Sequence, residues 1–310
     1  MEDLVIIGTG PAGLSAALYA ARYQLKTEII GQQLGGAMAE AWLVENYPGF
    51  QKISGLELAK RMKEQVEALG VKVIEDEVTK LRQEDGFSVF TRSGKVIEAR
   101  AIILALGTQR RKLNIPGESQ FLGRGVSYCA TCDGPLFQGK KVAVVGGGDS
   151  AIKTALLLER YASEVFLLVR GEELKGEPLN IEGVQKAKKV KIFYQTEVLE
   201  IKGNKKLDSL VLQKKGQKET LVVDGLFVEI GSVPAMKLLS DLKIKTNPLG
   251  YVIVDENQRT NLPFVYAAGD LTTSFGGFKQ ILTAAAQGAV AAHAAYQDLS
   301  KLHITKGKGQ

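Results

Sequence analysis

Cysteine and histidine are scarce in this chain. Only two residues of each kind occur among 310. The low cysteine count excludes a disulfide-rich scaffold, and each cysteine has no possible partner in the subunit except the other. His293 and His303 lie near the C-terminus without the spacing of a zinc finger. The sequence therefore offers no complete zinc ligand set, and we expect no metal.

Long apolar runs are also missing. No run approaches the ~20 residues that a membrane helix requires. The alanine-rich stretch 284–295 is interrupted by Gln287 and Gly288, which is typical of a packed helix. A strand pattern begins almost at the first residue, so we expect no signal peptide. The sequence thus predicts a soluble cytoplasmic enzyme with no membrane partner.

The basic charge has no nucleic-acid reading element beside it. The net charge is +6, and lysines between 186 and 191 supply much of the excess. A solvated face explains them, so we expect no nucleic-acid partner. The composition is ordinary for a globular protein, with 45% hydrophobic and 24% charged residues. The length suits about two domains.

The two cysteines belong to the stretch Cys129-Ala130-Thr131-Cys132-Asp133. Residues three apart on a helical turn lie roughly 5–6 Å apart, a separation that a disulfide tolerates. The pair can therefore open and close without moving the backbone, and the adjacent Asp133 can shuttle the proton that dithiol chemistry needs. A structural disulfide and half of a zinc site are the alternatives. The two nucleotide motifs described next favour redox chemistry.

A glycine turn follows the first strand pattern. An apolar run at 3–7 precedes Gly8-Thr9-Gly10-Pro11-Ala12-Gly13, and an amphipathic segment at 14–23 follows. Strand, glycine turn and helix together form a dinucleotide-binding fingerprint. The next strand, at 27–30, should end at an acidic ribose ligand, but Gln32 and Gln33 stand there. A glutamine can still hydrogen-bond a ribose hydroxyl.

A second glycine turn has the same context. The apolar run 141–145 leads into Gly146-Gly147-Gly148-Asp149-Ser150-Ala151 and an apolar helix through residue 161, and a strand at 165–169 follows. Two such turns in the right context indicate two nucleotide-binding domains.

The remaining elements divide the chain. We predict a helix at 54–69, a hairpin of 87–91 and 95–99, strands at 101–106, 226–230, 251–254 and 265–268, further strands within 190–224, a helix at 280–299 and a disordered tail at 306–310. Polar segments at 109–118 and 231–234 are interpreted as crossings between domains. The predicted fold is α/β, with two Rossmann-like domains and the second inserted into the first. The first comprises residues 1–114 and 242–310, and the second comprises residues 115–241.

The chain resembles the low-molecular-weight thioredoxin reductases over nearly its whole length. The matching stretches are Gly8–Gly13, Glu45-Asn46-Tyr47-Pro48-Gly49, Cys129–Gly134, Gly146–Ala151 and Ala267–Asp270. The most specific of them is Cys-Ala-Thr-Cys-Asp-Gly. The resemblance implies FAD in the outer domain, NADPH in the inserted one, a homodimer, and thioredoxin or a thioredoxin-like protein as the partner.

The resemblance also implies roles for particular residues. Cys132 would face the flavin, Cys129 would attack the partner disulfide, and Asp133 would give and accept protons. The residues expected to bind FAD are Gly8, Gly10, Pro11, Ala12, Gly13, Gln32, Gln33, Gly36, Asn46, Gly107, Gly269, Asp270, Lys279, Gln280 and Ile281. The residues expected to bind the nicotinamide cofactor are Gly146, Gly148, Asp149, Ser150, Ala151, Arg170, Lys175 and Gly231.

Two departures from the family pattern bear on the cofactors. Arginine is usual where Lys279 stands, so that contact should be weaker. The family grips the 2′-phosphate of NADPH with His-Arg-Arg and, three residues later, another Arg, whereas here only Arg170 and Lys175 are basic, with Glu172 and Glu173 between them. NADPH is predicted as the donor, with NADH or a protein electron donor as alternatives. Two competing functions remain. The protein could reduce another redoxin, or it could be a non-catalytic nucleotide-binding module.

Overall fold

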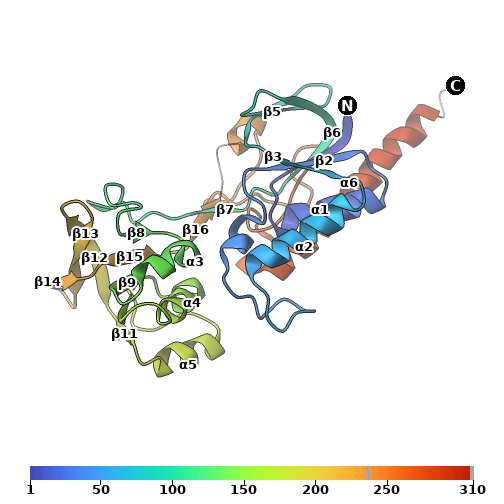
Figure 1. Ribbon diagram of the computed structural model, residues 1–310. Coiled ribbons are helices and arrows are strands. Elements are labelled where there is room, and N and C mark those ends of the chain that lie inside the picture. Colours follow the sequence, from blue (N-terminus) through green and yellow to red (C-terminus); the bar gives the residue numbers. More distant parts are fainter. Residues whose placement is uncertain (235–237, 308–310) are drawn as a thin grey trace. The chain divides into compact units, whose positions relative to one another are not determined.

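The computed structural model describes residues 1–234 and 238–307, and Figure 1 labels its elements. The chain divides into two compact units. Unit 1 consists of Met1–Gln109 and Val233–Gln310, and unit 2 consists of Arg110–Ser232. In sequence, unit 2 therefore lies inside unit 1. The predicted limits, after residues 114 and 241, lie somewhat later than these.

Unit 1 is built on a seven-stranded sheet in the order β3-β2-β1-β6-β5-β4, with β17 also paired to β6. The strands are β1 (Glu2–Ile7), β2 (Thr27–Gly31), β3 (Lys72–Glu75), β4 (Val78–Gln83), β5 (Phe87–Thr91), β6 (Val96–Leu104) and β17 (Val265–Ala267). β1 is parallel to β2 and β6, and its residues Leu4 to Ile7 are all buried. An uninterrupted apolar run is what a central parallel strand requires, because both of its faces are covered.

The helical elements of unit 1 are α1 (Pro11–Arg22), η1 (Gly36–Glu40), α2 (Gly55–Glu67), η3 (Leu239–Leu242), η4 (Ser274–Gly277) and α6 (Ile281–Gly307). α1 and α6 pack very closely: a Cβ added to Gly288 of α6 would lie 1.9 Å from the carbonyl oxygen of Ala12. The first turn of α1 is therefore packed against the backbone of α6 at Gly288.

Unit 2 contains a five-stranded parallel sheet in the order β11-β10-β9-β15-β8 and a three-stranded antiparallel sheet, β12-β13-β14. The strands are β8 (Val126–Ser127), β9 (Lys141–Val145), β10 (Glu164–Leu168), β11 (Val190–Phe193), β12 (Thr196–Gly203), β13 (Leu207–Lys214), β14 (Gln217–Val222) and β15 (Gly225–Val228). The helical elements are α3 (Ala130–Asp133), η2 (Gly134–Phe137), α4 (Asp149–Leu158) and α5 (Pro178–Lys186). Where the chain passes between the units, β7 (Thr108–Arg110) and β16 (Ser232–Pro234) pair as a two-stranded sheet.

Three local predictions were wrong. The strands expected at 95–99 and 101–106 form one strand, β6, because its first half pairs with β5 while its second half pairs with β1 and β17. No strand forms at 251–254, where Val252 alone makes isolated bridges to Thr246 and Thr272. The last helix continues beyond residue 299 to Gly307, so residues 306 and 307 are helical. Residues 308–310 of the predicted tail lie outside the described residues.

No helix in the described part of the chain is both long and apolar enough to cross a membrane.

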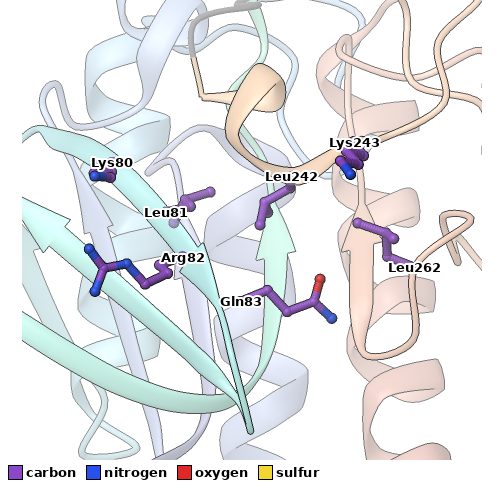
Figure 2. Close-up of a pocket in the computed structure, with 7 residues that line it drawn as sticks. All are labelled: Lys80, Leu81, Arg82, Gln83, Leu242, Lys243 and Leu262. Atoms are coloured by element: carbon purple, nitrogen blue, oxygen red, sulfur yellow. The ribbon is translucent and has the colours of Figure 1, made fainter.

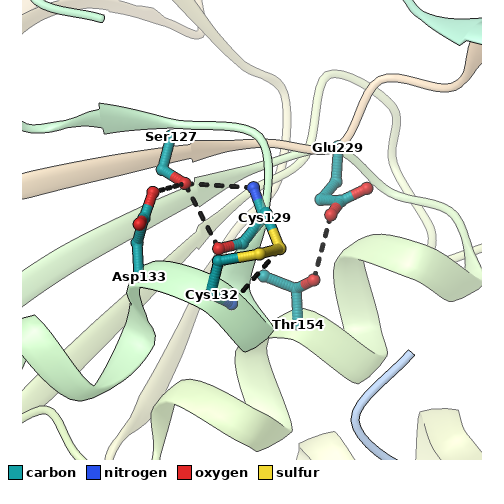
Figure 3. Close-up of a disulfide and its surroundings, with 6 residues drawn as sticks. All are labelled: Ser127, Cys129, Cys132, Asp133, Thr154 and Glu229. Atoms are coloured by element: carbon teal, nitrogen blue, oxygen red, sulfur yellow. Dashed lines mark hydrogen bonds between the residues drawn. A yellow bond between two sulfur atoms is a disulfide. The ribbon is translucent and has the colours of Figure 1, made fainter. Parts of the chain in front are cut away.

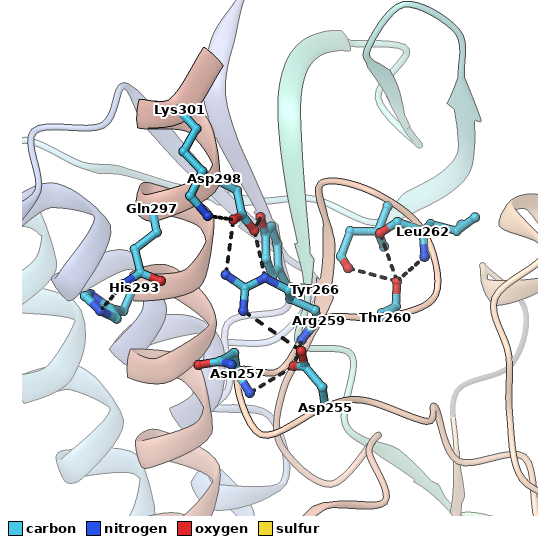
Figure 4. Close-up of polar contacts among 11 residues, drawn as sticks. Asp255, Asn257, Arg259, Thr260, Leu262, Tyr266, His293, Gln297, Asp298 and Lys301 are labelled. Carbon is cyan, nitrogen blue, oxygen red and sulfur yellow. Dashed lines mark hydrogen bonds and ion pairs between the residues drawn. The ribbon is translucent and has the colours of Figure 1, made fainter. Parts of the chain in front are cut away.

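A polar cluster links α6 to Tyr266 of β17 and to the turn that contains Arg259 (Figure 4). Asp298 accepts hydrogen bonds from the Arg259 guanidinium at 2.8 and 3.1 Å and from the Tyr266 hydroxyl at 2.9 Å. Burial alone would raise the pKa of Asp298, but these hydrogen bonds outweigh it and hold the pKa below its ordinary value. The carboxylate is therefore stabilised in its charged form.

Replacing Asp298 by Asn should lower the free energy of unfolding by about 1–3 kcal/mol at pH 7, because a charged acceptor is lost. A depressed folded-state pKa contributes stability above the unfolded pKa of about 4, and that stability disappears as the pH falls through the folded value. The difference between Asp298→Asn and wild type should therefore shrink in acid. Urea unfolding at pH 7 and near pH 3 measures it. Asp85→Asn, at an exposed position in the same unit, is the control and should follow the wild type at both values.

Candidate functional site

The cysteine pair closes on one helical turn. Cys129 is the N-cap of α3 and forms a disulfide with Cys132, with a Cα–Cα separation of 5.3 Å. Figure 3 shows the pair and its surroundings. The backbone N–H of Cys132 points at the Sγ of Cys129 at 3.2 Å. Such a donor would stabilise negative charge on that sulfur once the disulfide is reduced.

Asp133 is fixed beside the cysteines by a serine that the sequence analysis missed. Ser127, almost fully buried at the end of β8, donates to Asp133 Oδ2 at 2.6 Å and accepts from the backbone N–H of Cys129 at 3.0 Å. The backbone N–H of Asp133 in turn donates to the carbonyl of Cys129 at 3.0 Å. The available signal was a polar residue in a short apolar strand just before the first cysteine.

A second missed group lies at the end of β15. Glu229 is 7% exposed, pairs with Arg110 at 2.5 Å and accepts from the Thr154 hydroxyl at 3.2 Å. A glutamate closing an apolar strand was the available signal. The carboxyl edge of a parallel sheet is where ligands of doubly wound folds bind.

The second glycine turn joins β9 to α4. Gly148 is the N-cap of α4 and provides no side-chain cap, so the first N–H groups of the helix are left for another acceptor. A Cβ added to Gly146 would lie 2.1 Å from the carbonyl oxygen of Glu229 and 2.9 Å from the Cβ of Ala151. These close contacts explain why glycine and a small residue occupy the two positions. Ser150, beside them, is exposed.

The structure brings Lys175 to this turn but gives Asp149 another task. Lys175 donates its backbone N–H to the carbonyl of Gly147 at 2.7 Å. The carboxylate of Asp149 accepts from Asn180 at 2.9 Å, from the backbone N–H of Glu177 at 3.0 Å and from Lys153 at 2.7 Å. Asp149 thus links the first turn of α4 to the residues at the start of α5. Arg170 is exposed and lies 4.0 Å from the carboxylate of Glu197.

The first glycine turn joins β1 to α1. A Cβ added to Gly13 would lie 1.8 Å from the carbonyl oxygen of Gly8, so only glycine lets α1 approach β1 this closely. Gly10 is the N-cap of α1 without a side-chain cap, and Pro11 follows at the first helical position. A Cβ added to Gly10 would meet nothing nearer than 3.9 Å. The open space beside uncapped N–H groups, Ala12 among them, fits a pyrophosphate.

The glutamine turn lies beside this first turn. The Thr9 hydroxyl donates to the carbonyl of Gln33 at 2.8 Å, and the backbone carbonyl of Thr9 accepts from the N–H of Gly35 at 2.8 Å. A Cβ added to Gly36 would come within 3.6 Å of Gly10. Gln32, in the same turn, is exposed. The structure therefore brings the predicted adenosine-side residues to the predicted pyrophosphate site.

Asp270 is an enclosed carboxylate near the same end of the sheet. Gly269 precedes it, and a Cβ added there would lie 3.0 Å from the Cβ of Ala12. Burial raises the pKa of Asp270, and the charge of Lys279 partly opposes that rise. No hydrogen bond from the described residues reaches its carboxylate. An enclosed acceptor without a donor fits a ligand with hydroxyl groups, such as the ribityl chain of FAD.

The residues before α6 meet the 45–49 stretch and Tyr251. Asn46 donates to the side-chain oxygen of Gln280 at 3.1 Å, which unites two predicted flavin residues. Lys279 donates to the Tyr251 hydroxyl at 2.6 Å and lies 3.8 Å from the centre of its ring. Ile281 packs against a small apolar cluster around Met38.

Gly107 and Gly231 occupy the two passages between the units. Both have positive φ, +60° and +90°, and neither would have an atom within 4 Å of an added Cβ. The carbonyl of Gly231 accepts from the N–H of Arg111 at 3.0 Å. These glycines turn the chain next to β7 and β16.

Unit 1 also has a pocket of about 400 Å³ (Figure 2). It is lined by Lys80, Leu81, Arg82, Gln83, Leu242, Lys243 and Leu262. None of them is a predicted site residue.

Comparison with known proteins agrees with this geometry. The family described as pyridine nucleotide-disulphide oxidoreductase matches residues 2–288. A thioredoxin reductase of Treponema pallidum is 40% identical over 299 residues, covering 94% of this chain and 95% of the relative. The Lactococcus lactis thioredoxin reductase structure (FR conformation) has a TM-score of 0.93 and 38% identity, covering 97% of this chain and 100% of that one. The thioredoxin reductase structure of T. acidophilum has a TM-score of 0.91 and 36% identity, covering 96% and 98%. This chain therefore belongs to the pyridine nucleotide-disulphide oxidoreductases and, within them, to the low-molecular-weight thioredoxin reductases.

Proposed function

We propose that this protein is a thioredoxin-disulfide reductase that passes electrons from NADPH through FAD and the Cys129–Cys132 pair to oxidised thioredoxin. The observation that carries the proposal is the disulfide closed on one turn, with Asp133 held beside it by Ser127. Membership of the thioredoxin reductases supports an FAD-dependent oxidoreductase with thioredoxin as its substrate.

The protein residues perform the disulfide exchange. Two electrons and two protons open the Cys129–Cys132 disulfide to two thiols. The thiolate of Cys129, stabilised by the N–H of Cys132, attacks one sulfur of the thioredoxin disulfide and forms a mixed disulfide. Cys132 then attacks Cys129, so the original disulfide closes again and thioredoxin leaves as a dithiol. Asp133 delivers a proton to the departing sulfur.

FAD would bind at the first glycine turn of unit 1. It would supply the chemistry that protein side chains lack, accepting a hydride from a nicotinamide and releasing electrons to the disulfide. The uncapped start of α1 fits its pyrophosphate, and Gln32, Gln33 and Gly36 adjoin that site on the adenosine side. The enclosed carboxylate of Asp270 would accept hydrogen bonds from its ribityl hydroxyls.

The nicotinamide donor would bind at the second glycine turn of unit 2. We propose NADPH, because Arg170 is exposed and, among the described residues, its ion-pair partner is Glu197 at 4.0 Å. Glu172, one of the two interposed acids, accepts a 2.6 Å hydrogen bond from Gln195. That contact reduces its repulsion of a 2′-phosphate. Lys175 adds a second positive charge beside the turn, but one that is less directional than an arginine.

Replacing Arg170 by Ala should raise the KM for NADPH about threefold to tenfold and leave the KM for NADH nearly unchanged, because only NADPH carries the 2′-phosphate. Anaerobic stopped-flow reduction of the flavin with each donor measures this. Lys188→Ala removes one exposed charge from the same unit and should change neither value. Equal losses with both donors would place Arg170 at the shared pyrophosphate instead.

A protein electron donor is the second candidate. It is favoured only by the small number of basic residues, Arg170 and Lys175, at the expected 2′-phosphate site. Purified protein containing FAD should be yellow, and NADPH or NADH should bleach it without oxygen. If neither donor bleaches the flavin, a reduced protein donor must do so. A non-catalytic module would show no flavin reduction by any donor.

A homodimer is also proposed. Exposed apolar side chains on α1 and α6 support it, namely Tyr19, Leu282, Val290 and Tyr296. Such a face is suited to burial against a second copy of the chain.

A further inference from the structure

The two residues that lead into the first cysteine are each held by a different carboxylate. Ser127 donates to Asp133 at 2.6 Å. The next residue, Tyr128, donates its hydroxyl to Glu118. The backbone entering Cys129 is therefore restrained at two consecutive residues.

Glu118 is the fixed end of the second restraint. Its side chain belongs to a residue only 4% exposed, and it accepts from the backbone N–H groups of Leu113 at 2.8 Å and Asn114 at 2.7 Å in addition to the Tyr128 hydroxyl. Three donors on one buried carboxylate leave it little freedom to move. Glu118 therefore ties the first segment of unit 2 to the residue before the redox cysteine.

Tyr128 transmits that restraint. Its ring packs against the apolar core of unit 2, and neighbouring Leu113 and Ile115 pack there as well. Burial, together with the hydrogen bond to Glu118, raises the pKa of the Tyr128 phenol well above its ordinary value. The hydroxyl therefore stays a donor throughout the pH range in which disulfide exchange occurs.

Reduction of the pair changes the distance between the two sulfur atoms. Two bonded sulfurs are about 2.05 Å apart, whereas two thiols must separate to van der Waals contact. The side chains can make this adjustment without moving the backbone, but a loosely held backbone would let the two thiols move further apart. Holding Ser127 and Tyr128 limits that separation. The restraint therefore favours the disulfide, because it keeps the effective concentration of one thiol near the other high.

We propose that Glu118, acting through the Tyr128 hydroxyl, is a positioning residue that sets the redox equilibrium of the Cys129–Cys132 pair. The proposal rests on the redox role of the pair under the proposed function. Neither residue touches the sulfur atoms in this mechanism. Their effect is on how readily the disulfide opens.

The test is the equilibrium of the pair with a glutathione redox buffer, measured by alkylating free thiols at each buffer ratio under anaerobic conditions. Tyr128→Phe should shift this equilibrium about threefold to tenfold toward the dithiol, because a hydrogen bond to a buried carboxylate is lost. Glu118→Gln should shift it in the same direction, and the double variant should shift it no further than the larger single effect.

Tyr266→Phe is the matched control, since it also removes a buried tyrosine hydroxyl that donates to a carboxylate, Asp298, but in unit 1. It should lower the Tm without moving the glutathione equilibrium. An unchanged equilibrium in Tyr128→Phe and Glu118→Gln would overturn the positioning role while leaving the proposed function intact. A wild-type pair that neither glutathione nor dithiothreitol can reduce would overturn both.

Discussion

A Cys129→Ser or Cys132→Ser variant should reduce thioredoxin at least about 10³-fold more slowly than wild type, because the loss of a covalent nucleophile typically has effects of that order or larger. The residues proposed to bind the flavin belong to unit 1, whereas both cysteines lie in unit 2. Flavin content and flavin bleaching by the nicotinamide donor should therefore remain. Only re-oxidation of the reduced flavin by thioredoxin should be lost.

The two half-reactions can be measured separately. Anaerobic titration with the donor follows the first through flavin absorbance, and addition of oxidised thioredoxin follows the second. Thr131→Ser serves as the control, since it alters the same turn and retains both sulfurs, and it should keep most of the turnover. A serine variant of either cysteine with turnover near that of the wild type would contradict the redox role of the pair.

Replacing Asp133 by Asn should lower turnover with thioredoxin at least about tenfold, because positioned general acids contribute roughly 10²–10⁴-fold. The asparagine oxygen can still accept the 2.6 Å hydrogen bond from Ser127, so the local geometry should survive. The disulfide should remain titratable and the flavin reducible. The loss should therefore appear in kcat and not in the binding of FAD.

The matched control is Asp208→Asn, which neutralises another aspartate of unit 2 that accepts from a serine hydroxyl, Ser209, at 2.7 Å. It should leave the turnover unchanged. If Asp133→Asn retained the wild-type rate and pH profile, water or another group would supply the proton.

The glycine turns and the cysteine pair were predictable because each is written in consecutive residues. A single strand-to-helix turn requires the small residues Gly8, Gly10 and Gly13. A second turn of the same kind contains Gly146, Gly148 and Ala151. The helical spacing of Cys129 and Cys132 alone places the two sulfurs within bonding reach. Fold class followed from the same patterns, since apolar runs and amphipathic segments alternate along the chain.

Predictions failed where pairing partners decided the local structure. Residues 251–254 have the composition of a strand, but only Val252 finds bridge partners. Two strands were predicted at 95–99 and 101–106, yet β6 is continuous because its first half pairs with β5 and its second half with β1 and β17. The set of strands that a segment can join is a property of the folded sheet.

By itself, the sequence determined the two glycine turns, the cysteine pair and the acid beside it, because the geometry of each depends on neighbours within six residues. Only the tertiary structure decided which distant groups hold that site in place. Arg110 reaches Glu229 across 119 residues of chain, and Asn46 reaches Gln280 across 234. The first pair forms because the buried carboxylate of Glu229 requires a partner, and linear spacing carries no information about which residue the fold supplies.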